Sequence, residues 1–161
     1  MFRLLARSVA TRIRRVRQQA LGTPKLTSIE FRSAKFQPQQ NEDSETNPYR
    51  YGKALAVWIL EKLPTSKYPD AQVAAEDWGW LVLCQREPFT LSIGCGNQEQ
   101  TDDEGNWIPP DPNAIVWECF VDAKVPFFKR VFSKIDSDPA EKELDAWLRG
   151  ILQSDTEIHL L

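Results

Sequence analysis

The sequence predicts a single α+β domain, with a mostly antiparallel sheet of about five strands packed in two layers against two to three helices. Short stretches alternate apolar and polar residues with a period of two, as half-buried strands do. Longer stretches repeat apolar residues at helical spacing. The expected order of elements is β-α-β-β-β-(α)-α-β, in which the helices are segregated from a run of strands.

The first strand is expected within residues 26–36, where Ile29 and Phe31 alternate with Glu30 and Arg32. Residues 37–46 are polar and indicate a loop.

Capping signals predict two main helices. Asn47 and Pro48 suit an N-cap and the first helical position, and Pro64 should end that helix. Asp138 and Glu141 are spaced like a capping box for the last helix. The expected buried stripes are Tyr51, Leu55, Trp58, Ile59 and Leu63, and then Leu144, Trp147, Leu148, Ile151 and Leu152. A further short, packed helix is expected within residues 125–135.

Three strands are predicted between these helices, at residues 78–85, 89–95 and 114–121, and a short one at residues 156–161. The apolar pattern favours one register for the first hairpin. Its expected pairs are Cys84 with Phe89, Val82 with Leu91, Trp80 with Ile93, and Trp78 with Cys95. Leu81 and Leu83 then share the other face with Gly94 and Ser92.

Charge divides the chain into two parts. Residues 1–25 hold seven bases and no acid, whereas residues 26–161 hold 13 bases and 23 acids, a net charge of −10. An acidic body should repel nucleic acid and anionic membrane and suit a basic protein. We therefore expect residues 26–161 to form the domain.

Residues 1–25 form a basic amphipathic pattern that ends near Gly22. The pattern is typical of a mitochondrial transit peptide or of a helix lying on an anionic membrane. It also fits an upstream extension of a bacterial chain whose translation starts later, or a helix that docks on the body of a structural subunit. The body is accordingly expected in the cytoplasm, or in the mitochondrial matrix if the segment is a transit peptide.

The three cysteines, Cys84, Cys95 and Cys119, lack the paired spacing of a zinc site, and the chain has a single histidine, His159. They are expected to be reduced and mostly buried. No metal or cofactor is expected.

Two groups of residues invite a catalytic interpretation. Glu76 and Asp77 precede Trp78 and Trp80, so the two carboxylates could share acid and base roles beside a tryptophan wall. The simpler interpretation is a loop end followed by core tryptophans. Cys95 lies between two glycines and is expected to be exposed, but no neighbouring base is evident to activate it.

Residues 98–112 form a long acidic loop with an apolar centre. Its acids do not follow the ligand spacing of an EF-hand, which argues against calcium. Aromatic side chains rimmed by charge are typical of protein interfaces. The candidate contacts are Glu99, Asp102, Asp103, Glu104 and Trp107, with Glu76 and Asp77 as a second patch. The alternative is a solvated loop with Trp107 packed on the body.

Three stretches, residues 76–80, 93–97 and 131–136, resemble a group of small, uncharacterised bacterial proteins. The resemblance covers residues from about 27 to 161. It implies a bacterial, cytoplasmic protein and brings no activity and no functional residue with it.

These observations favour a non-enzymatic, acidic binding protein for a basic protein partner, on the model of immunity proteins and antitoxins. The alternative is a small enzyme that uses the carboxylate pair or Cys95 in a tryptophan-lined cleft.

Overall fold

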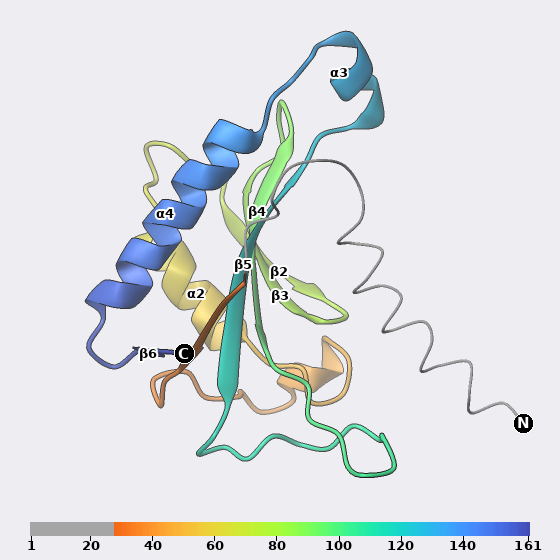
Figure 1. Cartoon of the computed structure of the whole chain (residues 1–161), viewed down its shortest axis with the longest axis vertical. Helices are drawn as coiled ribbons and strands as arrows, with labels where there is room; N and C mark the ends of the chain where they lie inside the picture. Colours follow the sequence, from red (N-terminus) through yellow and green to blue (C-terminus); the bar gives the residue numbers. More distant parts are fainter. Residues whose placement is uncertain (1–27) are drawn as a thin grey trace, which may run out of the picture.

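A computed structural model describes residues 28–161 of the chain, so the predicted basic segment at residues 1–25 lies outside the described residues. The described part has an α+β fold in which a six-stranded antiparallel sheet is packed with helices (Figure 1). In order, the strands across the sheet are β2, β3, β4, β5, β1 and β6.

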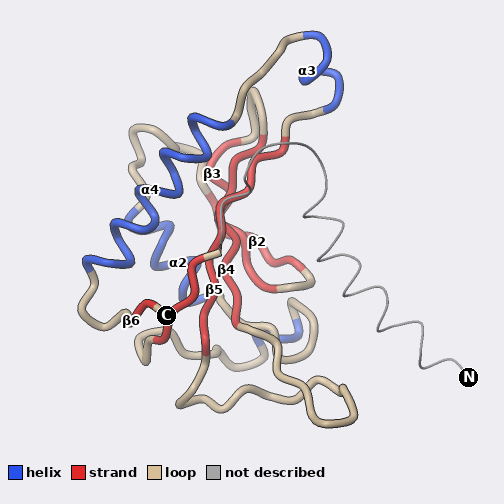
Figure 2. Tube along the Cα trace, in the orientation of Figure 1, coloured by secondary structure: helices blue, strands red, loops and turns tan. Residues whose placement is uncertain are grey.

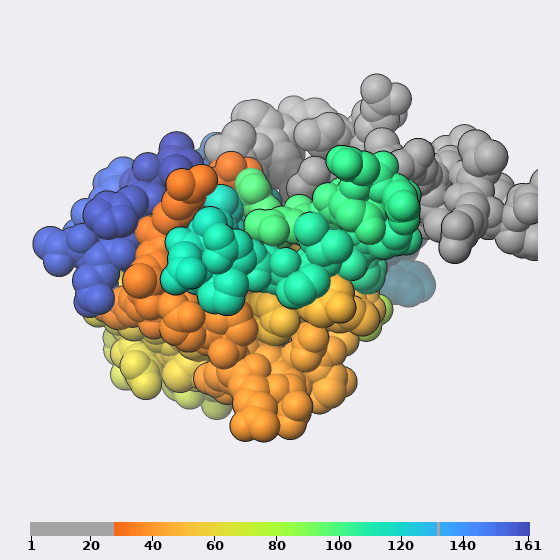
Figure 3. Space-filling model, turned by 90° about the horizontal axis from the view of Figure 1, so that it is seen from below, coloured from red at the N-terminus to blue at the C-terminus, as the bar shows by residue number. Residues whose placement is uncertain are grey.

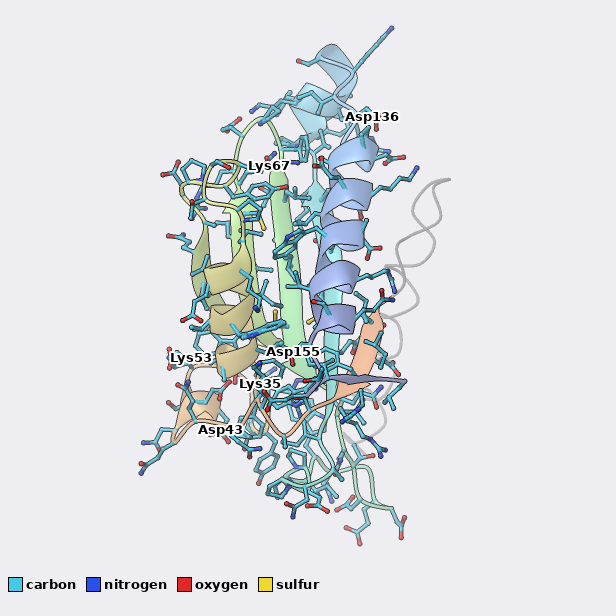
Figure 4. The ribbon with its side chains drawn as sticks, turned by 90° about the vertical axis from the view of Figure 1, so that its left-hand side faces the viewer. Lys35, Asp43, Lys53, Lys67, Asp136 and Asp155 are labelled. Carbon is cyan, nitrogen blue, oxygen red and sulfur yellow. The ribbon has the colours of Figure 1, made fainter. Side chains whose placement is uncertain are left out.

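The strands are β1 (Ile29–Arg32), β2 (Gln72–Glu76), β3 (Gly79–Gln85), β4 (Thr90–Asn97), β5 (Val116–Lys124) and β6 (His159–Leu160). The helices are the 3-10 turn η1 (Glu42–Ser44) and the α-helices α2 (Lys53–Lys62), α3 (Phe127–Phe132) and α4 (Asp138–Ser154). Helices α2 and α4 lie side by side on one face of the sheet (Figure 4). The core lies between this face and the two helices.

Most predicted apolar stripes are confirmed. Ile29 and Phe31 point into the core from β1, and the alternate residues of β5 from Trp117 to Val121 are buried with them. Leu144, Leu148 and Leu152 of α4 are buried, while Trp147 and Ile151 pack at the edge of the core. Hydrophobic burial of these stripes is the main favourable term that holds the two layers together.

From Trp80 on, the hairpin of β3 and β4 has the predicted faces but not the predicted register. Trp80 pairs with Cys95 and Val82 with Ile93, two residues away from the expected pairs, and a bulge follows at residues 83–85. A shift of two residues keeps every side chain on its face, because side chains alternate with a period of two. The bulge adds a residue before the turn, which the apolar pattern could not reveal.

Several element boundaries also differ from the predictions. Strand β2 was not expected, and the first helix begins at Lys53, not at Asn47 and Pro48. The residue before α4 is Ser137, and no side-chain capping hydrogen bond is formed there. Helix α3 exists, but Phe127, Phe128 and Val131 are exposed, whereas the predicted helix was packed.

Candidate functional site

The loops at residues 33–52 and 98–115 lie together at the lower end of the sheet (Figure 2). Viewed from below, they form most of that face of the molecule (Figure 3). We use the name acidic end for the surface made by Glu76, Asp77, Glu99, Asp102, Asp103, Glu104 and Trp107. The structure places the β2–β3 turn, which carries Glu76 and Asp77, beside the start of the acidic loop at Glu99, because Arg50 contacts both.

Arg50 joins the two patches. Its Nε donates a hydrogen bond to the carbonyl oxygen of Trp78 (3.0 Å), and its Nη1 donates one to that of Asn97 (3.0 Å). The same Nη1 lies 3.6 Å from Oε1 of Glu99. The Arg50 side chain is only 13% exposed, so its guanidinium interacts mainly with groups of the protein itself. Sequence reasoning missed this residue, because a lone arginine in a polar stretch carries no local signal.

Asn97 completes the link between the two patches. Its Oδ1 accepts a hydrogen bond from the amide of Tyr51 (2.8 Å), and its Nδ2 donates to the carbonyl oxygen of Tyr49 (3.2 Å). The amide of Asn47 also donates to the carbonyl oxygen of Asp77 (2.8 Å). Residues 47–51 thus connect the β2–β3 turn to the start of the acidic loop.

The tip of the acidic loop is an ordered turn. Oδ1 of Asp102 accepts hydrogen bonds from the amides of Glu104 (3.0 Å) and Asn106 (2.8 Å), and Oδ2 accepts one from Nδ2 of Asn106 (2.9 Å). The side-chain hydrogen bond from Asn106 is the largest of the interactions that lower the pKa of Asp102. Gly105 has a φ of 83°, a conformation that glycine adopts readily. Asp102 therefore stabilises the backbone conformation of the turn and also contributes to its negative charge.

Trp107 and Ile108 form the apolar part of the acidic end. A β-bridge joins Trp107 to Thr101, and the amide of Ile108 donates to the carbonyl oxygen of Gln100 (3.0 Å). These backbone contacts hold both side chains at the surface, where Trp107 is 43% and Ile108 36% exposed. Asp103 and Glu104, beside them in the turn, are exposed as well.

The predicted carboxylate pair lies on a turn. Glu76 ends β2 opposite Gly79, and Asp77 and Trp78 form the two-residue connection. Both carboxylates are exposed. The indole of Trp78 packs on the ring of Phe120, 5.3 Å between centroids.

The two tryptophans of this stretch lie on opposite faces of the sheet. Phe120, which Trp78 contacts, points away from the core, because its neighbours Cys119 and Val121 in β5 point into it. Trp80 lies on the core face, with Nζ of Lys53 4.6 Å from its ring centroid. The expectation that Trp78 and Trp80 share a face is wrong, and they do not form one wall beside the carboxylates.

Cys95 is buried, which contradicts the expectation that flanking glycines expose it. It lies opposite Cys119 in the register of β4 and β5, and both side chains are fully buried. Burial raises the pKa of the Cys95 thiol well above its usual value, so the nucleophilic thiolate is disfavoured. Burial likewise raises the pKa of Cys84 to about 12. The three cysteines are free thiols.

Among residues 28–161, no three His, Cys, Asp or Glu side chains are grouped so that they could hold a metal ion. Within the same range, every helix is too short or too polar to cross a membrane. No protein-family model, curated protein or solved structure matches this chain.

Proposed function

We propose that this chain is a non-enzymatic binding protein whose acidic end receives a basic protein partner, as immunity proteins and antitoxins receive the basic toxins that they neutralise. The observation that carries the proposal is the ordered loop at residues 99–111. It holds five acids and no base, and it presents Trp107 and Ile108 at the surface.

The arrangement has the parts that a protein interface needs. Apolar anchors at the centre supply most of the binding energy when water is excluded from them, and a charged rim sets specificity. Exposed acids of one sign also speed the approach of a basic partner, an effect that salt screens. Because the turn at Asp102 is already ordered, binding costs less conformational entropy than the ordering of a flexible loop would.

The alternative, a small enzyme, has less support from the same geometry. A carboxylate pair needs unequal, partly dry surroundings to divide acid and base roles. Glu76 and Asp77 are both exposed on the β2–β3 turn. Cys95 lies inside the sheet, where its thiol is protonated and out of reach of substrate.

The proposal is tested with the full chain as bait, in a lysate of the source organism at low salt. We expect one basic protein to be retained in stoichiometric amount and released as salt rises. Its affinity for the purified chain should fall at least tenfold when Asp103→Lys and Glu104→Lys are combined.

The matched control combines Glu61→Lys and Asp70→Lys, two exposed positions outside the acidic end. This pair changes the net charge by the same amount and should retain most of the affinity. If both pairs weaken binding equally, the partner responds only to net charge and the acidic end is not the site. Recovery of bait alone from repeated lysates would count against a protein partner altogether.

A further inference from the structure

A second exposed surface lies at the other end of the molecule. Helix α3 projects beyond the sheet at the top of Figure 1, whereas the loop at residues 98–112 lies at the bottom. Phe127 is 74% exposed, Phe128 73% and Val131 53%. The two phenylalanine rings meet edge to face, 6.1 Å between centroids. We use the name α3 tip for Lys124, Phe127, Phe128, Arg130, Val131 and Lys134.

The exposed apolar residues of the α3 tip call for an explanation. Neighbouring large apolar side chains left in water commonly mark an interaction site. A salt bridge from Lys129 to Glu87 ties α3 to the β3–β4 turn, while Phe127 and Phe128 stay exposed. The ion pair thus anchors α3 to the turn, but no side chain within residues 28–161 buries Phe127 and Phe128.

The charge of the α3 tip is the reverse of that at the acidic end. Residues 124–134 hold four bases and no acid, within a body whose net charge is −10. Residues 99–111 hold five acids and no base. Each segment also exposes two or more large apolar side chains. The chain therefore carries two surfaces of opposite charge, and each surface has exposed apolar side chains at its centre.

We propose that the α3 tip binds the acidic end of a second copy of this chain. In this contact Phe127 and Phe128 pack against Trp107 and Ile108. Arg130 and Lys134 face the exposed carboxylates of Asp103 and Glu104. The inference rests on the proposed function, because the acidic end is the receiving surface in both.

The positions of the two surfaces determine the form of the assembly. Since they lie at opposite ends of the long axis, one chain cannot satisfy both surfaces by itself (Figures 1 and 4). A head-to-tail contact also leaves one free surface at each end of a pair, so further copies can add in a row. A basic protein that occupies the acidic end would compete with the α3 tip and shorten such rows.

The test begins with sedimentation velocity on the full chain over a range of concentrations. At low salt we expect the weight-average mass to rise above twice 18.5 kDa and to return to that of the monomer as salt increases. A tip variant (Phe127→Ser with Phe128→Ser) and an end variant (Asp103→Lys with Glu104→Lys) should each remain monomeric. All four positions are exposed, so unchanged unfolding midpoints should verify that both variants fold.

Mixing the two variants is the decisive step. The tip variant keeps an intact acidic end, and the end variant keeps an intact α3 tip. An equimolar mixture should therefore form a complex of two chains that grows no further. A mixture that stays monomeric, or a single variant that still self-associates, overturns the proposal.

Two further outcomes also overturn it. The wild-type chain could stay monomeric while its α3 tip binds vesicles that contain phosphatidylserine, in which case the occupant is an anionic membrane. It could stay monomeric while the acidic end retains a basic protein from lysate. That second result would exclude self-association but support the proposed function. If instead the chain self-associates and no basic protein is retained from lysate, the self-association is supported and the proposed function is excluded.

Discussion

The carboxylate of Glu42 accepts a hydrogen bond from the amide of Gly52, ten positions further along the chain, with Oε1 2.7 Å from the nitrogen. The same oxygen accepts one from the amide of Lys53 (2.7 Å), and Oε2 accepts one from the amide of Gln39 (2.8 Å). A buried acid from η1 thus caps α2, in the place of the cap predicted from Asn47. An anion at a helix N-terminus is also favoured by the helix dipole.

Glu42→Gln should destabilise the protein by about 1–3 kcal/mol. The side-chain amide of glutamine has one acceptor oxygen, and its NH₂ group would face backbone donors. Glu42 is only 2% exposed, so water cannot supply the missing acceptor. Urea unfolding, read as the shift in midpoint at constant slope, measures the effect.

Glu45→Gln is the matched control for this change. Glu45 pairs with Lys53 through Oε1 and Nζ (2.8 Å), but its side chain is largely exposed. Exposed ion pairs contribute little, so the midpoint should barely move. Equal effects of the two substitutions would show that Glu42 acts by charge alone and not as a cap.

Gly94→Ala should destabilise the protein by about 1–3 kcal/mol, because overpacking forces neighbours to move. A Cβ at Gly94 would lie 2.4 Å from the ring of Phe120, which Trp78 in turn contacts. Adding Phe120→Leu to Gly94→Ala should recover part of the loss. Thermal unfolding of the single and double variants measures both changes.

Gly150→Ala should have the opposite effect on the stability of the protein. Gly150 lies in α4 with open space around the position of its Cβ. Alanine there should stabilise the protein by about 0.5–1 kcal/mol, since it removes the conformational freedom of glycine within a helix. If both alanine variants were destabilised alike, the contact with Phe120 would not be the cause.

Asp102→Asn should loosen the tip of the acidic loop without unfolding the domain. The substitution weakens the three hydrogen bonds to Glu104 and Asn106, so amide hydrogen exchange at these two residues should accelerate. Asp103→Asn removes the same charge from an exposed neighbour and should leave exchange unchanged. Unchanged exchange in the Asp102 variant would mean that the backbone alone holds the turn.

The same turn should respond to acid. Hydrogen bonds from Asn106 lower the pKa of Asp102, so the folded loop favours the ionised carboxylate. Its contribution to loop order is present above the ordinary pKa of aspartate and is lost as pH falls through the lowered value. Exchange at Asn106, corrected for its intrinsic pH dependence, should therefore rise only in strong acid.

Stability should fall in alkali because of Cys84. Its pKa is raised to about 12 by burial, so in the folded protein the thiol keeps its proton where the unfolded chain loses it. Stability from this group is complete below the ordinary pKa of a cysteine thiol, about 9, and declines between there and about 12. Cys84→Ala should lower stability at neutral pH but flatten this alkaline decline. An equally steep decline in the variant would assign it to other groups, such as the buried Tyr68, whose pKa burial also raises.

Much of the fold could be predicted from sequence because two local patterns were strong. The alternation of Ile29 and Phe31 with polar neighbours and the helical stripe of Leu144, Leu148 and Leu152 both indicate one buried face. Strand β2 escaped prediction because glutamine, alanine and glutamate have low strand propensity, and only pairing with β3 makes that segment a strand.

In the candidate site, too, some features could be predicted from the sequence and others could not. Its acids and Trp107 could be selected from the sequence, since exposed charge around an aromatic residue is a local feature. Their meeting with Glu76 and Asp77 could not, because it depends on Arg50 and Asn97, which bind backbone carbonyls and amides far along the chain.

The sequence by itself determined which residues face the core and where charge accumulates, because periodicity and composition are properties of neighbouring residues. The tertiary structure decided the cap of α2, the burial of Cys95 and the exposure of Phe127 and Phe128. Each of these depends on which distant backbone groups and side chains come within contact distance, and such contacts form only when the sheet and helices assemble.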